Sequence, residues 1–144
     1  MLKYLLIAGL ITMLSPQTKA QTPDDSDREE FIATMTNFAS TQHYVDQIPQ
    51  YEGGFGALFD YLHKNMVYPE AAKKEHLSAQ VFVSFIIDKK TGLPRESKIV
   101  QSSNTKFNSE TLRLIKAMPA WQPAKVHDQD VNMVLTIPVY FHWD

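Results

Sequence analysis

The stretch Ala79-Gln-Val-Phe-Val-Ser-Phe-Ile-Ile-Asp88 decides the fold that this chain can adopt. Every second residue from Val81 to Ile87 is apolar, which is the pattern of a β-strand with one buried face. The other face is partly apolar as well, because it carries Phe82 and Ile86. A strand with apolar side chains on both faces is typical of the interior of a sheet, so we expect it to have neighbours.

The residues that follow this strand predict a hairpin. Lys89-Lys-Thr-Gly92 is polar and ends in a glycine, which suits the left-handed corner of a four-residue hairpin loop. Leu93–Gln101 is then the returning strand, with Ile99 and Val100 as its strongest positions. Pro94 is tolerated because it lies near the start of the strand.

A helix precedes the hairpin. Its apolar side chains recur at i, i+3, i+4, i+7 and i+11 and form one stripe. They are Phe55, Leu58, Phe59, Leu62 and Met66. We expect this helix to end near Asn65, because Pro69 disfavours helical backbone at Tyr68. Pro69 also suits the first position of a second, short helix, Glu70–Glu75.

A further helix and a final strand follow the hairpin. Asn108 or Ser109 can cap the helix, which Pro119 closes. The final strand is Val131–Phe141 and contains Pro138. Because proline has no N–H to donate to a ladder, this strand should lie at a sheet edge or carry a bulge there. Two helices with a small, mainly antiparallel sheet make a two-layer α+β domain.

Length and composition exclude several classes of protein. The chain has 144 residues, with 14 Lys+Arg, 16 Asp+Glu and no cysteine. That length supports one domain. A formal net charge of -2 argues against nucleic-acid binding, which needs a basic face. Without cysteine there is no disulfide scaffold, thiolate nucleophile or cysteine-based metal site.

The N-terminus predicts an export signal. Lys3 is followed by the apolar run Tyr4–Leu14, and small residues, Thr18 and Ala20, precede a break after Ala20. The run is too short for a bilayer, which needs about 20 apolar residues. We therefore expect residues 1–20 to be a signal peptide and the mature protein to be periplasmic, with no stable membrane anchor after cleavage; an uncleaved anchor is the alternative.

Residues 21–48 form the expected leader before a folded domain at 49–144. The sequence Ser26-Asp-Arg-Glu29 fits a capping box, and apolar residues at i, i+4 and i+7 from Phe31 then favour a short helix. Gln42–Ile48 favours a strand that Pro49 stops.

A search for chemistry finds no catalytic, metal or cofactor motif. His127-Asp-Gln-Asp130 could chelate a cation in principle, but a solvated loop is the better interpretation. Gly53-Gly-Phe-Gly56 opens a helix but lacks the Gly-Lys-Ser/Thr ending of a phosphate loop. No carboxylate pair can be placed on one wall of a cleft. We therefore expect a binding module that is not an enzyme and needs no cofactor.

Residues 49–141 resemble the C-terminal domain of the TonB family, in its Bacteroidetes-type version. The resemblance lies in a series of short motifs that follow one another in the family's order. They are Pro49-Gln-Tyr51-Glu-Gly53-Gly54, Ala57-Leu58, Tyr61-Leu62, Asn65, Tyr68-Pro69-Glu-Ala71-Ala72, Val81-x-Val83-x-Phe85-Ile86-Ile87-Asp88, Gly92, Met118-Pro119-x-Trp121-x-Pro123 and Ile137-Pro138-Val139-x-Phe141.

The resemblance implies two helices on one side of an antiparallel sheet, as the residue patterns also do. It implies that the domain captures a short peptide from the plug of an outer-membrane transporter by strand addition to the sheet edge. The final strand and the segment before the short helix are then the receptor-facing parts. The partner-binding residues implied in this way are Tyr68, Pro69, Val131, Met133, Leu135, Ile137 and Val139.

The sequence also departs from the family pattern. Glu52, Ala79 and Ala124 stand where the family has Pro, Gly and Gly. Without an anchor the chain cannot transmit force, so an adaptor or competitor role is expected. Two alternatives stay open: a structural or dimerising envelope protein that uses the same edge, and a small enzyme or ligand carrier. An edge covered by Gln42–Ile48 would favour the structural alternative.

Overall fold

Strand β1, Ala79–Ile87, is the centre of a three-stranded antiparallel sheet with the order β2-β1-β5. β2 is Pro94–Ser102 and β5 is Met133–Phe141. The structure is a computed structural model that describes residues 25–143, so the predicted signal peptide, residues 1–20, lies outside the described residues. The prediction of an interior strand is confirmed, because β1 pairs with a strand on each side.

One face of the sheet forms the core. The alternating residues of β1 from Val81 to Ile87 are at most 1% exposed. The register places Val139 of β5 opposite Val81 and Met133 opposite Ile87, so the odd-numbered residues of both strands share this face. The core therefore contains the alternate apolar residues of both strands.

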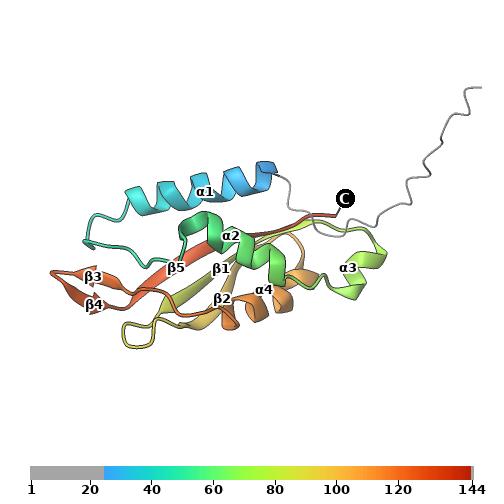
Figure 1. Cartoon of the computed structure of the whole chain (residues 1–144). Coiled ribbons are helices and arrows are strands. Elements are labelled where there is room, and N and C mark those ends of the chain that lie inside the picture. Colours follow the sequence, from blue (N-terminus) through green and yellow to red (C-terminus); the bar gives the residue numbers. More distant parts are fainter. Residues whose placement is uncertain (1–24, 144) are drawn as a thin grey trace, which may run out of the picture.

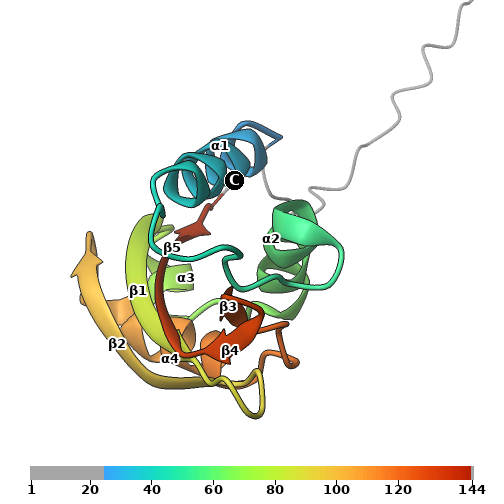
Figure 2. The same cartoon turned by 90° about the vertical axis from the view of Figure 1, so that its left-hand side faces the viewer.

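Helices close the core on the other side. After the short 3-10 helix η1, Thr105–Phe107, comes α4, Asn108–Lys116, which packs on β1 and β2. α2, Gly54–Asn65, buries Leu58, Phe59 and Leu62, and α3 is Glu70–Lys74. Figure 2 shows the sheet along one side of the molecule, with α4 behind β1 and β2, α2 on the opposite side and α1 above. The prediction of an α+β fold is confirmed.

Helix α1, Asp25–Ser40, packs on the same core and is longer than the short helix that the sequence predicts. Its Phe31 and Met35 are fully buried. The predicted strand at Gln42–Ile48 is wrong: the backbone makes turns and one isolated bridge, between Gln47 and Lys125. The carbonyl of Lys125 accepts from the N–H of both Asp46 (2.8 Å) and Gln47 (3.2 Å), and the next pairing of this segment is a second isolated bridge, between Gln50 and Gln122.

The predicted final strand, Val131–Phe141, is divided in two. Its first residue belongs to β4, Gln129–Val131, which pairs with β3, Ala124–Val126, as a small separate hairpin. β5 begins only after Asn132, whose side-chain Oδ1 accepts the N–H of Lys89 at 2.8 Å. The expected edge position is confirmed, because β5 lies at one edge of the sheet (Figure 1).

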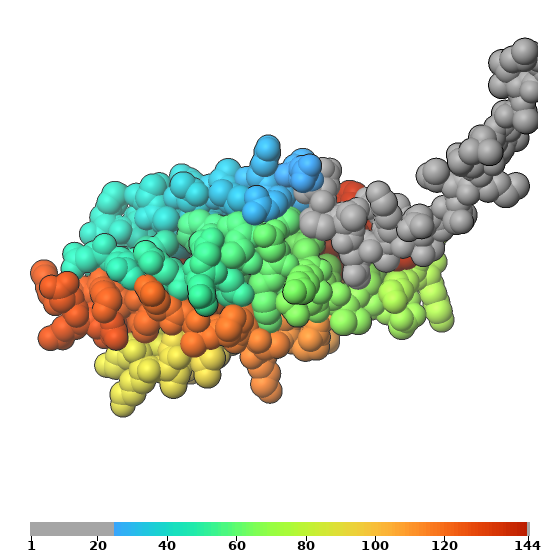
Figure 3. Space-filling view, in the orientation of Figure 1, coloured from blue at the N-terminus to red at the C-terminus, as the bar shows by residue number. Residues whose placement is uncertain are grey.

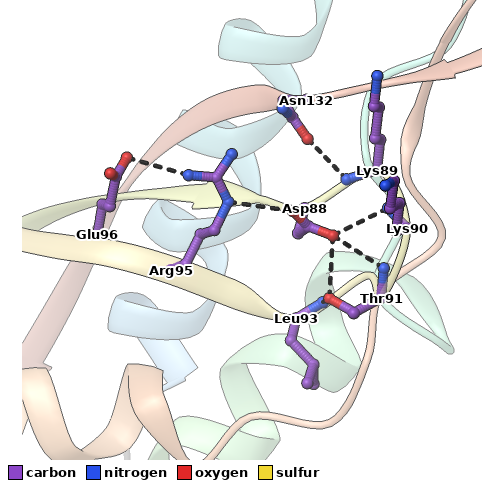
Figure 4. Close-up of polar contacts among 8 residues, drawn as sticks. All are labelled: Asp88, Lys89, Lys90, Thr91, Leu93, Arg95, Glu96 and Asn132. Carbon is purple, nitrogen blue, oxygen red and sulfur yellow. Dashed lines mark hydrogen bonds and ion pairs between the residues drawn. The ribbon is translucent and has the colours of Figure 1, made fainter.

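The β1–β2 loop is organised by Asp88 (Figure 4). Its Oδ2 accepts the backbone N–H groups of Lys90 (2.9 Å) and Thr91 (3.0 Å), and its Oδ1 lies 3.1 Å from Nε of Arg95. These hydrogen bonds, that of Thr91 first, hold the pKa of Asp88 below its usual value. The carboxylate thus adds to the backbone hydrogen bonds that close the turn, from Asp88 N–H to the carbonyl of Leu93 and from Gly92 N–H to the carbonyl of Asp88.

Candidate functional site

The direction of the β5 backbone shows which of its groups face the open edge. His63 Nε2 lies 3.2 Å from the carbonyl oxygen of Tyr140, so that carbonyl points away from β1. The residue of β1 opposite Tyr140, Gln80, supports this direction. Its N–H and its carbonyl are both hydrogen-bonded to Ser103, on the side of β1 that faces away from β5. Since the N–H and carbonyl groups of successive residues point to opposite sides of an antiparallel strand, those of the even-numbered residues of β5 point away from β1, toward the open edge.

Val134, Thr136 and Pro138 therefore present their backbone groups at this edge. Val134 and Thr136 each offer an N–H and a carbonyl, whereas Pro138 offers a carbonyl alone. Within residues 25–143, neither Val134 nor Thr136 makes a backbone hydrogen bond on the outward side. The Val134 side chain is 55% exposed. The edge from Val134 to Thr136 is thus a row of unused hydrogen-bonding groups.

The opposite edge of the sheet, β2, is built differently. Its pairing with β1 shifts register in two places, and Glu96 has a φ of 53°, outside the strand region. It starts with Pro94, and charged side chains, Arg95 and Lys98 among them, lie along it. Such irregularities protect an edge against pairing. β5 is therefore the edge better suited to accept a further strand.

The far end of the β5 edge is covered. Pro138 is buried, and Tyr140 is only 8% exposed and lies beside Glu30 of α1, which contacts β5. Burial, with Glu30 and Asp27 of α1 nearby, raises the pKa of Tyr140 to about 12. Burial also lowers the pKa of His63, although hydrogen bonds to the carbonyls of Phe59 and Tyr140 oppose the shift. An added strand has free access only before Pro138.

The seven residues predicted as partner contacts fall into three places. Met133, Leu135, Ile137 and Val139 have side chains that are at most 6% exposed and face the core. Val131 is half-buried in β4. Tyr68 is 1% exposed and packs edge-on against Phe107, and the half-buried Pro69 precedes α3. On β5, a partner strand would contact the backbone of the residues that alternate with Met133, Leu135, Ile137 and Val139.

The outward-facing residues Val134 and Thr136 are absent from that predicted set. The sequence does carry a signal for them, because a proline on an edge strand must direct its missing N–H outward. Pro138 therefore indicates the outward direction, and residues two and four positions earlier share it. The apolar pattern of the strand instead favours the odd-numbered residues, because apolar side chains mark the face that packs in the core.

A cleft of about 690 Å³ lies elsewhere, between residues 48–55 and 120–122. Trp121 lines it but is 3% exposed and packs edge-on against Tyr51, with ring centroids 5.3 Å apart. Glu52 is the sole carboxylate of the lining, so the cleft offers no acid–base pair. Across residues 25–143, His, Asp and Glu side chains form no group of three that could hold a metal.

The comparisons with known proteins find similarity to one family. The sequence model described as Gram-negative bacterial TonB protein C-terminal matches residues 64–143. The solution structure of the Helicobacter pylori TonB C-terminal domain aligns at 22% identity and a TM-score of 0.48, over 61% of this chain and 91% of that one. The Pseudomonas aeruginosa TonB C-terminal domain aligns at 21% identity and a TM-score of 0.42, over 53% and 76%.

Two further findings complete the comparison. No curated protein matches the sequence. In the part of the chain from residue 25 to 143, none of the helices has both the length and the apolar character that a membrane span requires.

Proposed function

Since the chain belongs to the TonB C-terminal-domain family, we propose that it is a periplasmic module that captures an extended peptide of the outer-membrane transport machinery. The peptide adds as a strand to the edge of β5. The observation that carries this proposal is the row of outward N–H and carbonyl groups at Val134 and Thr136, on an edge without the irregularities of β2. The signal peptide expected at residues 1–20 gives the location.

In strand addition, the backbone and the side chains of the peptide contribute differently: the backbone to affinity and the side chains to selectivity. Main-chain hydrogen bonds to Val134 and Thr136 supply affinity that does not depend on the peptide sequence. Selectivity comes from the peptide side chains on the outer face of the sheet, where Val134 lies beside Ile86 of β1. A peptide with a β-branched or aromatic residue at that position is therefore preferred.

A structural or dimerising role through the same edge is the second candidate. It is favoured by the exposure of Val134, because two copies of β5 could pair with each other. Within residues 25–143, the backbone bonds of Asp46 and Gln47 go to Lys125 of β3. This segment therefore does not pair with the β5 edge, so the covered edge that would favour the structural alternative is not found within residues 25–143.

The experiment is a titration of labelled transporter plug peptides, taken from the same genome, against the exported chain. Val134→Pro deletes an outward N–H while leaving the hydrogen bonds to β1, so it should weaken binding about tenfold or more. Val134→Thr keeps the N–H and the branched shape and serves as the matched control. Equal binding by both variants would remove this edge from the mechanism.

The same variants separate the two candidates. If no peptide binds and the wild-type chain sediments as a dimer that Val134→Pro dissociates, the structural role is correct. If the chain is a monomer that binds peptide and loses it only with Val134→Pro, the capture role is correct.

A further inference from the structure

We propose that α1 is a displaceable cover over the far end of the β5 edge and limits the length of strand that the chain can accept. This inference rests on the proposed function, because it concerns access to the same edge. It assigns a role to a helix that lies outside the region matched by the family, residues 64–143.

Helix α1 is placed to act as a cover. Phe31 and Met35 point inward and are fully buried, and the Phe31 ring lies 5.5 Å from that of Phe59 in α2. α1 forms the upper rim of the molecule above α2 (Figure 3). It also contacts β5 directly, and Figures 1 and 2 both place it beside the final part of that strand.

The cover stops the free edge at Pro138. The outward direction continues through Pro138 to Tyr140, so both carbonyls could in principle accept from an added strand. The Tyr140 carbonyl is already approached by His63 of α2, whereas the Tyr140 side chain is buried close to Asp27 and Glu30 of α1. A peptide strand that runs past Thr136 beside the Tyr140 side chain must therefore displace α1, while the Tyr140 carbonyl stays with His63.

Residues 28–40 of α1 are attached to the rest of the molecule by side chains and not by strand pairing. Phe31 and Met35 are its only fully buried side chains. Arg28 pairs with Asp60 of α2 at 3.2 Å, but the side chains are 41% and 63% exposed, so water and salt weaken the pair. Between residues 28–40 and β5 no backbone hydrogen bond is made. The sheet itself therefore need not be broken when α1 moves.

Displacement makes affinity depend on peptide length. A short peptide that pairs only with Val134 and Thr136 binds with α1 in place. A long peptide binds the uncovered form, so its apparent affinity is reduced by the fraction of molecules in which α1 is displaced. Weakening the attachment of α1 therefore tightens binding of the long peptide and leaves that of the short one unchanged.

The test uses a transporter plug peptide that binds in the titration described above, in two lengths, about five and about ten residues at ~3.3 Å per residue. Met35→Ala weakens α1 and should raise the long-to-short affinity ratio about tenfold. Met118→Ala is the matched control, because Met118 is equally a core methionine, 3% exposed, but lies after α4. It should leave the ratio unchanged.

A second measurement reads α1 directly. Hydrogen exchange of the amides of residues 28–40 should accelerate when the long peptide binds and stay constant with the short one. Unchanged exchange, or an affinity ratio that Met35→Ala does not change while Val134→Pro still weakens binding, overturns the cover and leaves the proposed function standing. If no peptide binds, or binding ignores Val134→Pro, the proposed function fails and this inference fails with it.

Discussion

Gly92 shows how a single residue fixes the position of two distant segments. Its φ of +71° is in the left-handed region, and its carbonyl accepts the N–H of Trp121 at 2.8 Å. A Cβ at this position would collide with the carbonyl oxygen of Trp121. The β1–β2 loop and the segment before β3 can therefore approach this closely only with glycine here.

Gly92→Ala should lower the free energy of unfolding by about 2–4 kcal/mol, because it combines left-handed strain with a backbone collision. Gly54→Ala is the control, since Gly54 has a φ of +82° but no atom within 4 Å of the added Cβ. Only strain of about 1–2 kcal/mol is expected there. Urea midpoints of the two variants give the comparison, and equal losses would show that the collision is relieved by movement of Trp121.

His63 makes stability depend on pH. Burial lowers its pKa below the ordinary value of 6.5, so the folded state binds a proton less readily than the unfolded state. The contribution of neutral His63 to the free energy of unfolding is fully present above pH 6.5 and is lost as the pH falls through the folded-state pKa. Unfolding measured between pH 8 and about 5 should show a shallower loss of stability in His63→Gln than in the wild type. Parallel curves would mean that His63 is solvated in the folded protein.

At the scale of elements, Glu110 connects α4 to the end of α2. It is 8% exposed, accepts the N–H of Val67 at 3.1 Å and pairs with Arg113. Arg113 Nη2 in turn donates to the carbonyl of Asn65 at 2.8 Å, in the last turn of α2. The pair thus satisfies backbone groups where α2 ends and the chain turns toward α3.

Glu110→Ala should cost about 1–3 kcal/mol of unfolding free energy, because the N–H of Val67 loses its acceptor. Glu110→Gln retains an acceptor oxygen and should cost less. A double-mutant cycle with Arg113→Ala measures the coupling, for which we expect about 0.5–3 kcal/mol. Additive losses would show that each side chain acts on the backbone independently.

For the whole molecule, stability should be distributed unevenly. β1 has a paired strand on each side and one face in the core, whereas α1 has two fully buried side chains, Phe31 and Met35, and is otherwise attached by partly buried side chains and an exposed ion pair. In native-state hydrogen exchange, the α1 amides should open at a lower free energy than those of β1. Identical opening energies for both elements would mean that α1 leaves the core only when the protein unfolds.

Elements that bury a continuous apolar face could be predicted from the sequence, whereas short elements without such a face could not. The period-two pattern of β1 and the stripe of α2 are strong signals because each element buries a continuous face. The β3–β4 hairpin was not predicted, because its strands have three residues each and its turn uses His127 and Asp128 at positive φ, where Asn-Gly would be the recognisable signal.

The candidate site was predictable to the level of the strand but not of its outward residues. Pro138 correctly placed β5 at an edge. The side chains of Leu135 and Ile137, chosen because they are apolar, are buried for the same reason. The cover formed by α1 could not be foreseen, because a short amphipathic segment does not reveal which part of a sheet it will contact.

The difference between the two sheet edges sets a limit on assembly. Because β2 is interrupted by register shifts and by the positive φ of Glu96, it cannot serve as a template once β5 has received a strand. Under the proposed function, each copy should therefore accept one partner strand, whether that strand comes from a transporter or from a second copy. Complexes should reach a fixed stoichiometry, and the protein is protected from polymerising through its own sheet.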